Sequence, residues 1–245
     1  MNPGTGALTR GLEVLEVLSG EDVARSGLGV VRLAQRLDGD RSQISRTLQT
    51  LHDHGFVERD AETLAYRLGW RVFTLAARAG EARLLNEAPP VLRALVRDLG
   101  ESVHLSVRQG AMVLTLLAES PPAALHAPGR IGGLAPIATT SAGRVLVCDL
   151  TLQELDELGL EHLASIVDDV AAAGYSIVRE EFEPGLVAAA APIFGPAGRV
   201  TAALNVSGPQ FRFDDRLEEA ARHLVISANR LSEALGGTPG RGKGH

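Results

Sequence analysis

The most regular hydrophobic pattern of the chain lies in residues 30–54, where apolar residues recur at helical spacing in two short runs. In the second run Ile44, Leu48 and Leu51 fall at i, i+4 and i+7, which predicts an amphipathic helix with one buried stripe. Asp40 stands where the N-cap of that helix belongs, with a glutamine three residues later, as in a capping box. Two short helices around a tight Asp-Gly turn predict a helix-turn-helix unit.

Two short segments of alternating polar and apolar residues follow that helix, at 56–59 and 64–68, around a polar turn. The pattern predicts a β-hairpin, and a hairpin after a helix-turn-helix unit is a wing. The outward face of the second helix and the hairpin carry side chains that can reach base edges or phosphates. The predicted DNA contacts are Arg41, Ser42, Gln43, Ser45, Arg46, Gln49, Arg59 and Arg67.

The charge balance of this part of the chain is not basic. Residues 1–70 contain eight arginines and no lysine against ten acidic residues, whereas DNA-binding domains normally show a basic surface. The docking surface is still expected to be locally positive, because four arginines are close together in the sequence: Arg32, Arg36, Arg41 and Arg46. Since each protomer can neutralise few phosphates, we expect weak binding by a monomer and joint binding of several half-sites by an oligomer.

Residues 70–85 predict a connecting helix with a broad face of small apolar residues. This face suits pairing with a second copy of the chain, although a simple hinge helix has the same pattern, and it consists of Val72, Phe73, Leu75, Ala76 and Ala79. Pro89 and Pro90 then predict a break and the start of a new helix. We therefore expect a DNA-binding domain at 1–69, a linker and dimerisation helix at 70–88, a second domain at 89–236 and a disordered tail at 237–245.

From residue 91 onward the pattern changes to mixed helices and strands, which indicates an α+β fold. Turns that contain glycine join successive apolar runs, as in hairpins. The predicted strands are 102–108, 111–119, 175–179, 186–194 and 200–206. The predicted helices are 91–99, 140–150, one that starts at 151, 161–173 and 214–235. We expect an antiparallel sheet covered by helices on one face.

Composition limits the function classes. A length of 245 residues with 45% apolar residues is typical of two folded domains. No apolar run is long enough to cross a bilayer and no signal-peptide pattern is present, so we expect a cytoplasmic protein without membrane contact. The single cysteine, Cys148, is expected to be a small buried side chain of an apolar helix. The histidines lack metal-ligand spacing and no glycine-rich phosphate loop occurs, so neither metal nor cofactor is expected.

Several short motifs, taken in order, resemble those of the IclR-type bacterial transcriptional regulators. The likeness spans about residues 8–235 and rests on GFVERD at 55–60 with YRLG at 66–69, GESVHL at 100–105, TSAGR at 140–144, EPG at 183–185 with API at 191–193, and NVSGP at 205–209. The resemblance implies an N-terminal winged helix-turn-helix, a linker helix that dimerises and a C-terminal domain similar to GAF and PAS sensors that binds a small effector. It also implies a homo-dimer, or a tetramer built from two dimers.

In similar regulators the effector lies between the central sheet and a loop-helix segment. The positions that correspond here, with two further apolar residues that we place against the ligand, are Ser141, Ala142, Val178, Ala188, Asn205, Ser207, Leu114 and Leu134. The sequence departs from the family pattern at Ala138, Val178 and Ala188, where other members carry histidine, an acidic residue and cysteine. These departures remove polar groups, so small carboxylates such as glyoxylate or pyruvate would be poorly paired.

Asn205 and Ser207 fall on one face of a strand, which leaves an amide and a hydroxyl available to a ligand. We therefore expect a moderately apolar effector with one or two hydrogen-bonding groups, such as an aromatic compound or an amino-acid-derived metabolite. A pocket that has been lost, in which these two residues only complete the sheet, is the alternative.

Three functions remain open at the level of sequence. The favoured one is a ligand-responsive DNA-binding regulator, with repression the commoner mode among similar proteins. The second is an enzyme whose winged helix is only structural, with His104 as a base and the hydroxyls at 139–141 as nucleophiles, although such hydroxyls usually cap helices. The third is an architectural DNA-binding protein that does not respond to ligands.

Overall fold

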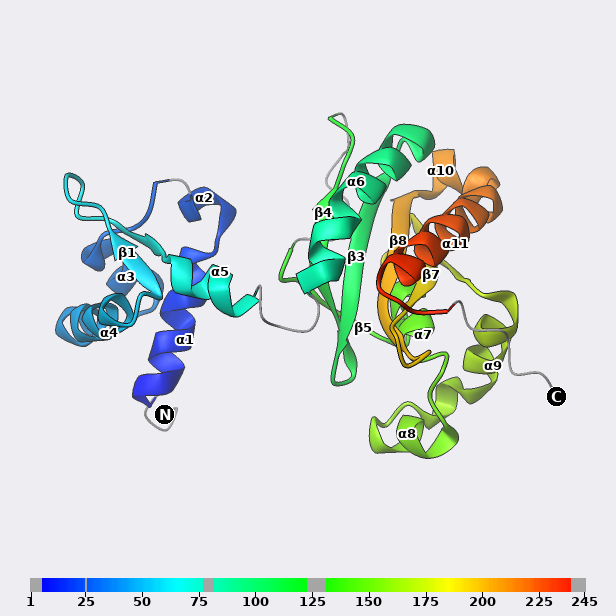
Figure 1. Ribbon diagram of the computed structural model, residues 1–245, viewed down its shortest axis with the longest axis horizontal. Coiled ribbons are helices and arrows are strands. Elements are labelled where there is room, and N and C mark those ends of the chain that lie inside the picture. The colour runs from blue at the N-terminus through cyan, green and yellow to red at the C-terminus, as the bar shows by residue number, and fades with distance from the viewer. Residues whose placement is uncertain (1–5, 25, 77–81, 123–130, 239–245) are drawn as a thin grey trace. The chain divides into compact units, whose positions relative to one another are not determined.

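The computed structural model describes residues 6–24, 26–76, 82–122 and 131–238 of the chain. The chain divides into two compact units, Met1–Ala82 and Arg83–His245 (Figure 1). Each unit has a hydrophobic core made by its own helices and strands. Most of the predicted disordered tail, at 239–245, lies outside the described residues.

Short helices around a β-hairpin build the N-terminal unit. In chain order the elements are α1 (Ala7–Leu18), α2 (Glu21–Ala24), α3 (Val30–Arg36), α4 (Arg41–Asp53), β1 (Val57–Arg59), β2 (Tyr66–Leu68) and α5 (Trp70–Ala76). The core contains Leu33 of α3, Ile44 and Leu48 of α4 and Val57 of β1, each at most 1% exposed. Asp38 in the turn between α3 and α4 takes a left-handed backbone angle, φ 46°. The predicted helix-turn-helix and its wing are therefore confirmed.

The chain that connects the two units differs from the prediction. α5 ends at Ala76, residues 77–81 with Ala79 lie outside the described part, and α6 (Ala82–Leu99) contains both Pro89 and Pro90. The predicted break at these prolines is therefore wrong. Each proline costs the helix about 3 kcal/mol, but burial contributes roughly 2 kcal/mol per leucine along one stripe of α6. That stripe consists of Leu84, Ala88, Leu92, Leu95 and Leu99.

A six-stranded antiparallel sheet forms the centre of the C-terminal unit. Its spatial order is β5 (Leu134–Pro136), β4 (Met112–Glu119), β3 (Ser102–Gln109), β8 (Val200–Pro209), β7 (Leu186–Phe194) and β6 (Ser176–Arg179). Besides α6, the helices are α7 (Ser141–Leu146), α8 (Leu152–Glu157), α9 (Ala164–Ala173), α10 (Gln210–Phe213) and α11 (Leu217–Ala234). The predicted strands are confirmed, and the short edge strand β5 was not predicted. Cys148 is buried, as expected.

Helices cover both faces of the sheet, so the expectation of helices on one face is wrong (Figure 1). α6 and α11 pack on the face that carries Val103, Leu105 and Leu204. α7, α8 and α9 pack on the opposite face, called here the second face, which carries Ala190 and Ala203. The predicted α+β architecture, a winged helix-turn-helix followed by a sensor-like sheet domain, is otherwise confirmed.

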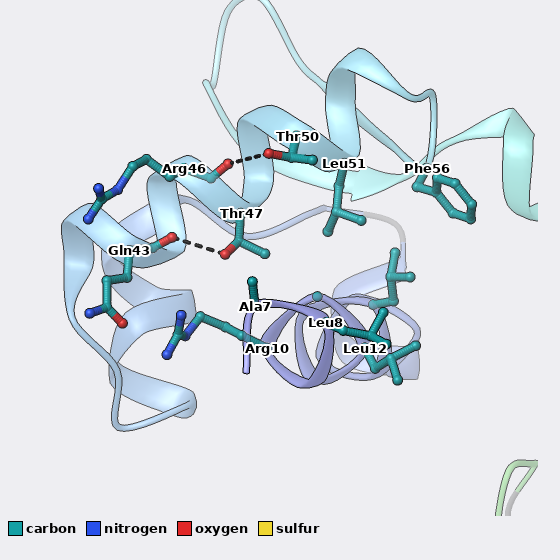
Figure 2. Close-up of a pocket in the computed structure, with 12 residues that line it drawn as sticks. Ala7, Leu8, Arg10, Leu12, Gln43, Arg46, Thr47, Thr50, Leu51 and Phe56 are labelled. Atoms are coloured by element: carbon teal, nitrogen blue, oxygen red, sulfur yellow. Dashed lines mark hydrogen bonds between the residues drawn. The ribbon is translucent and has the colours of Figure 1, made fainter. Parts of the chain in front are cut away.

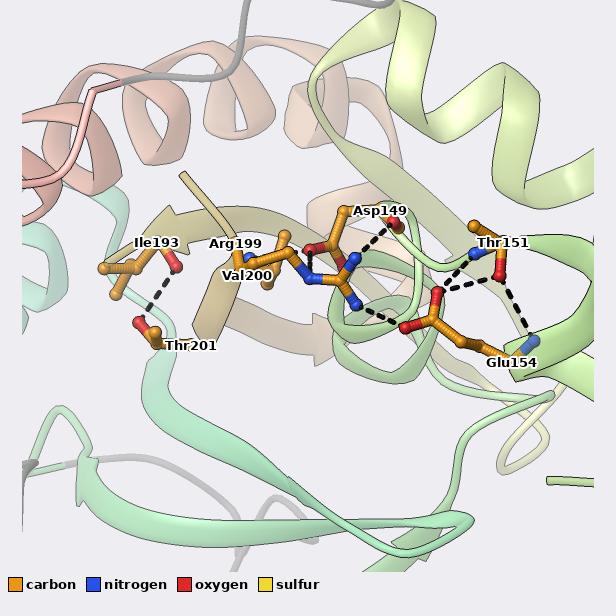
Figure 3. Close-up of polar contacts among 7 residues, drawn as sticks. All are labelled: Asp149, Thr151, Glu154, Ile193, Arg199, Val200 and Thr201. Atoms are coloured by element: carbon orange, nitrogen blue, oxygen red, sulfur yellow. Dashed lines mark hydrogen bonds and ion pairs between the residues drawn. The ribbon is translucent and has the colours of Figure 1, made fainter. Parts of the chain in front are cut away.

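A polar cluster joins the turn between β7 and β8 to the helices of the second face (Figure 3). Arg199 Nε lies 3.0 Å from Oδ2 of Asp149, just after α7, and Arg199 Nη2 lies 2.9 Å from Oε1 of Glu154 in α8. Asp149 also accepts a hydrogen bond from Val200 N at 3.0 Å. Hydrogen bonds from Thr151, which complete a capping box at the start of α8, are the largest cause that lowers the pKa of Glu154. The cluster therefore fixes the C-terminal end of α7.

Candidate nucleic-acid interface and ligand pocket

The orientation of α4 is set by its buried stripe and by its cap. Ile44 and Leu48 are buried in the core, so the remaining positions of the helix face outward. Asp40 Oδ1 accepts hydrogen bonds from Gln43 N at 2.9 Å and from the Ser42 hydroxyl, and the Ser42 bond is the largest cause that lowers the pKa of Asp40. The predicted N-cap is confirmed. Among the described residues, the Gln43 side chain makes no hydrogen bond back to the Asp40 backbone, so the capping box is incomplete.

All predicted DNA-contacting residues are exposed. They lie on α4 and on the two hairpin strands, and they are Arg41, Ser42, Gln43, Ser45, Arg46, Gln49, Arg59 and Arg67. Figure 2 shows Gln43 and Arg46 projecting from the same side of α4. The hydroxyls of Thr47 and Thr50, by contrast, donate to carbonyls of their own helix at 3.0 Å and 3.1 Å. The surface that must enter a DNA groove is therefore available.

Local contacts distinguish the exposed side chains of α4 from one another. The Ser42 hydroxyl is engaged by the cap, and Gln49 Nε2 donates to Asp53 Oδ1 at 2.7 Å. Arg46 Nε donates to the Ser42 carbonyl at 3.4 Å, and the terminal guanidinium nitrogens bond no other described residue. A guanidinium has five donors in a planar fork, so Arg46 retains the geometry that reads guanine. Arg46 is the strongest candidate for base recognition.

The hairpin arginines are placed to contact phosphates. Arg59 lies over the ring of the buried Tyr66, with 5.5 Å between its guanidinium carbon and the ring centroid. Arg67 faces Glu58 across the hairpin, with 3.5 Å between Nε and Oε2, and the two side chains are 52% and 36% exposed. Such an exposed pair contributes little stability, so Arg67 can exchange Glu58 for a phosphate at small cost.

The charge around α4 is less positive than the arginine spacing predicts. Arg36 Nη2 lies 2.6 Å from Oδ2 of Asp22, which offsets the charge of this arginine. Arg32, Arg41 and Arg46 remain exposed. Because affinity for DNA depends on the number of phosphates that are neutralised, so small a set of cations favours joint binding by more than one protomer.

A groove of about 670 Å³ runs between α1 and the neighbouring side of α4 (Figure 2). Its walls include Leu8 and Leu12 of α1 together with Phe56. The hydroxyls of Thr47 and Thr50 in this groove are bonded to helix carbonyls, whereas Arg10, Gln43 and Arg46 add polar side chains to its lining. Because Gln43 and Arg46 are predicted DNA contacts, this groove borders the surface that the sequence assigns to DNA.

A more enclosed cavity of about 290 Å³ lies on the second face of the sheet, next to the start of α7. Seven of the eight predicted effector residues line it, namely Leu134, Ser141, Ala142, Val178, Ala188, Asn205 and Ser207. Ten further residues line the cavity that the sequence did not predict as effector contacts. They are His104, Ser106, Val113, Thr115, Gly133, Ala135, Thr139, Thr140, Phe182 and Leu186.

Leu114 is the predicted effector residue that the structure places elsewhere. Val113 and Thr115 line the cavity, so Leu114 between them points to the opposite side of β4. A β-bulge is the cause, because a register shift in the pairing of β3 with β4 leaves Leu116 without a partner. The extra residue reverses the alternation of β4, and the assignment of Leu114 to the pocket is corrected accordingly.

Polar side chains of β3 and β8 form the floor of the cavity. Ser106 Oγ donates to Asn205 Oδ1 at 3.4 Å, and Asn205 Nδ2 lies 3.4 Å from His104 Nδ1. In this arrangement Nδ1 of His104 accepts, so Nε2 carries the ring proton. Ser207 is only 4% exposed, and its hydroxyl has no hydrogen-bond partner among the described residues. An unpaired buried hydroxyl is costly, so the floor presents a polar group that a ligand can satisfy.

The start of α7 is shaped by two residues of the TSAGR motif. Thr140 caps the helix by accepting from Gly143 N at 3.1 Å, and its hydroxyl donates to Pro136 O at 2.7 Å. A Cβ at Gly143 would lie 2.3 Å from the carbonyl oxygen of Ile137, so only glycine allows this approach. The threonine hydroxyl therefore acts as a cap, and the glycine lets α7 reach the edge of the cavity.

An ion pair holds the mouth of the cavity. Arg144 Nε donates to Ala138 O at 3.1 Å, and Arg144 Nη2 pairs with Glu181 in the connection between β6 and β7. Phe182, the next residue, lines the cavity and is 39% exposed. The pair thus joins α7 to the segment that carries Phe182.

His104 is expected to make the C-terminal unit sensitive to acid. Burial lowers the pKa of His104 from 6.5 to about 4, so below about pH 6.5 the unfolded chain binds a proton that the native chain does not. Stability is then lost between those two pKa values, by about 3 kcal/mol in total. Urea unfolding followed by circular dichroism at about pH 7 and about pH 4.5 should show a smaller loss for His104→Gln than for the wild type. His223→Gln, on the exposed face of α11, serves as the control, and an equal loss in all three proteins would contradict the prediction.

The chemistry of the alternative enzyme is not assembled in this cavity. His104, with a pKa of about 4, is a weak base at neutral pH, and the Thr140 hydroxyl is occupied by the cap. The described residues contain no group of three or more side chains placed to hold a metal ion. Of the helices in the described part, none has both the length and the apolar character required to cross a membrane.

Comparison with known proteins covers both units. The IclR helix-turn-helix domain matches residues 7–61, and the bacterial transcriptional regulator IclR C-terminal domain matches residues 77–233. The chain is 34% identical to the HTH-type transcriptional regulator BhcR of Paracoccus denitrificans, over 93% of this chain and 86% of that protein. It is 29% identical to the transcriptional repressor IclR of Escherichia coli, over 96% and 93% of the two chains.

Solved structures share the same fold. An IclR homolog complexed with 4-hydroxybenzoate, from Microbacterium hydrocarbonoxydans, superposes with a TM-score of 0.75 at 24% identity, covering 94% of this chain and 99% of that one. A putative transcriptional regulator from Rhodococcus superposes with a TM-score of 0.70 at 27% identity, covering 94% and 97%.

An exposed recognition helix in one unit and a cavity in the other, together with the family matches of both units, define a DNA-binding transcriptional regulator that responds to a ligand. The chain belongs to the IclR family of bacterial transcriptional regulators. The resemblance of its motifs is thereby confirmed, and the family consists of regulators rather than enzymes.

Proposed function

We propose that this chain is a repressor that binds double-stranded operator DNA through α4, with the hairpin arginines on neighbouring phosphates. The observation that carries the proposal is the exposure of the polar face of α4 opposite the buried Ile44 and Leu48. The proposed contacts are Arg41, Ser42, Gln43, Ser45, Arg46 and Gln49 for the groove, and Arg59 and Arg67 for the backbone. Repression is supported by relatives that are named repressors, such as IclR of Escherichia coli.

The proposed effector is a ring-sized, moderately apolar compound held in the cavity of about 290 Å³. Residues 1–69 would then read DNA, residues 70–88 would dimerise, and residues 89–236 would bind the effector. The complex of the Microbacterium hydrocarbonoxydans relative with 4-hydroxybenzoate supports an aromatic effector. Apolar walls with a few polar groups are typical of sites for such compounds, and the proposed contacts are Leu134, Ser141, Ala142, Val178, Ala188, Asn205 and Ser207.

A homo-dimer or a tetramer in the bacterial cytoplasm is proposed as the active form. The small number of exposed arginines near α4 supports it, because two or more recognition helices together neutralise more phosphates than one. Trp70 and Leu75 of α5 are exposed in the single chain, which supports the dimerisation role of this segment.

Effector and DNA are proposed to act on one equilibrium between arrangements of the protomers. A ligand shifts such an equilibrium only by the difference between its affinities for the two arrangements. Its effect on DNA affinity and the effect of DNA on ligand affinity are therefore equal.

A mobility-shift assay with the intergenic DNA next to the protein's own gene tests the proposed function. We expect the full-length protein to shift one fragment and to release it when a compound from a panel of aromatic and amino-acid-derived metabolites is added. Mass photometry of the complex should count a dimer or a tetramer on each fragment. Binding that no ligand alters would indicate an architectural protein, and the lack of any sequence-specific shift would rule out the regulator proposed here.

A further inference from the structure

We infer that the effector places an uncharged hydroxyl or carbonyl oxygen against Ser207 and His104 at the floor of the cavity. This assignment rests on the proposed function, which makes the cavity the effector site. It narrows the ligand class to neutral ring-sized compounds such as phenols, benzylic alcohols and aromatic amides. A ligand that buries a carboxylate against the floor is excluded.

The unpaired hydroxyl of Ser207 carries the first step. This residue lines the cavity, is 4% exposed and has no hydrogen-bond partner among the described residues for its Oγ atom. Its neighbours across the sheet are Ala188 on β7 and Ser102 on β3. Ala188 has no polar side-chain atom, and the Ser102 hydroxyl is bonded to Ser120 at 2.9 Å. A single oxygen of the ligand would satisfy Ser207.

His104 supplies a second polar group within reach of the same oxygen. Its partner on β8 is Asn205, two residues before Ser207, so His104 and Ser207 are diagonal neighbours on one face of the sheet. Diagonal neighbours lie about 7 Å apart, which leaves room for one bridging oxygen. Because Asn205 holds Nδ1 of the ring as an acceptor, Nε2–H is the donor that His104 can offer.

The electrostatics of the floor disfavour an anion. Among the described residues that line the cavity, none is an aspartate, glutamate, lysine or arginine. His104 is neutral near pH 7 because burial lowers its pKa to about 4. A carboxylate at this place would lose its hydration without gaining a cation, or would force a proton onto His104. A neutral oxygen avoids both costs and still makes the two hydrogen bonds.

Calorimetry with three probes that carry one polar group on the same ring tests the inference. Benzamide and benzyl alcohol are neutral, and benzoate is an anion near pH 7. We expect the full-length protein to bind each neutral probe at least about tenfold more tightly than benzoate. We also expect no proton uptake, so the binding enthalpy should be the same in buffers that differ in their enthalpy of ionisation.

Ser207→Ala isolates the hydroxyl from the rest of the pocket. We expect this variant to bind benzamide about threefold to tenfold more weakly, as for the loss of one hydrogen bond, without a lower melting temperature because the lost group is unpaired. Ser102→Ala is the matched control, since it removes a hydroxyl from the adjacent strand at a position outside the cavity lining. Its affinity for benzamide should stay within about twofold of the wild type.

The remaining outcomes distinguish the inference about the ligand from the proposed regulator function. Tighter binding of benzoate with uptake of a proton overturns the inference and leaves the proposed regulator intact. Unchanged affinity of Ser207→Ala, or failure of all three probes to bind, also overturns the inference. The proposed function fails only in the separate DNA assay, if the protein gives no sequence-specific shift or if no ligand releases the DNA.

Discussion

Replacement of Arg46 by alanine is expected to abolish the operator shift at protein concentrations where the wild type binds all of the DNA. A guanidinium that reads a base pair contributes about 1–3 kcal/mol, so each half-site should lose roughly tenfold to a hundredfold in affinity. In a dimer that occupies two half-sites the two free-energy losses add, so the two fold-changes in affinity multiply. Fluorescence anisotropy with labelled operator DNA measures the change.

The fold should survive this substitution, because Arg46 is exposed and its Nε makes one long bond to its own helix. Arg108→Ala removes the same charge from an exposed position of β3 and should bind operator DNA like the wild type. Arg46→Lys keeps the charge but loses the planar fork, so its affinity should fall between those of Arg46→Ala and the wild type. Operator binding by Arg46→Ala equal to that of the wild type would show that α4 does not read the bases.

Replacement of Ala188 by phenylalanine is expected to abolish the response to effector while operator binding without effector is retained. Ala188 lies on β7 within the floor of the cavity, and the new ring would occupy the space of about 290 Å³ that the ligand needs. Ligand affinity should fall by more than about a hundredfold, because a filled pocket must be reopened before binding. Calorimetry measures the affinity, and the mobility shift with saturating effector measures the response.

Overpacking can also destabilise the sheet, so Ala188→Val provides a smaller change at the same position. A graded loss of ligand affinity from alanine through valine to phenylalanine, with melting temperatures close to that of the wild type, is the expected series. Leu114→Ala serves as the control, because Leu114 lies on the side of β4 that faces away from the cavity. This variant should leave ligand affinity unchanged. Full effector response in Ala188→Phe would place the effector site elsewhere in the protein.

The recognition helix could be predicted from sequence because several independent signals agree there. Ile44 and Leu48 mark the buried side, Asp40 marks the start, and the positions between the apolar residues are polar. Such agreement between period, cap and turn is characteristic of segments whose local preferences match the fold. The structure accordingly exposes the residues that the pattern assigned to DNA.

The arrangement of helices around the sheet could not be predicted in the same way. β7 carries Val187 and Ile193 toward α6 and α11, but its other side is also apolar, with Ala188 and Ala190. A strand that is buried on both sides shows no alternation of polar and apolar residues, so its sequence does not tell how many faces are covered. The prolines of α6 led to the wrong prediction of a helix break. Burial of the leucine stripe of α6 outweighed the local preference against proline inside a helix.

The residues of β8 in the pocket floor were predicted, but those of β3 were not. Asn205 and Ser207 were assigned from the family resemblance and share one face of a strand, whereas His104 was considered only as a catalytic base. Its role as a neighbour of Asn205 depends on the pairing of β3 with β8, which joins residues far apart in the chain. The bulge opposite Leu105 could not be predicted for the same reason, because the register of a sheet depends on both of the strands that pair.

The exposed rim of the cavity determines how a ligand can exchange. Phe182 is 39% exposed on the connection between β6 and β7, and Leu134 is 55% exposed on the edge strand β5. That connection is held by the ion pair between Arg144 and Glu181 and by the hydrogen bond from Gln210 N to Gly185 O at 2.8 Å. A ligand that enters on this side would have to displace both contacts, whereas the central strands and the hydrophobic cores on either side of the sheet would not need to move.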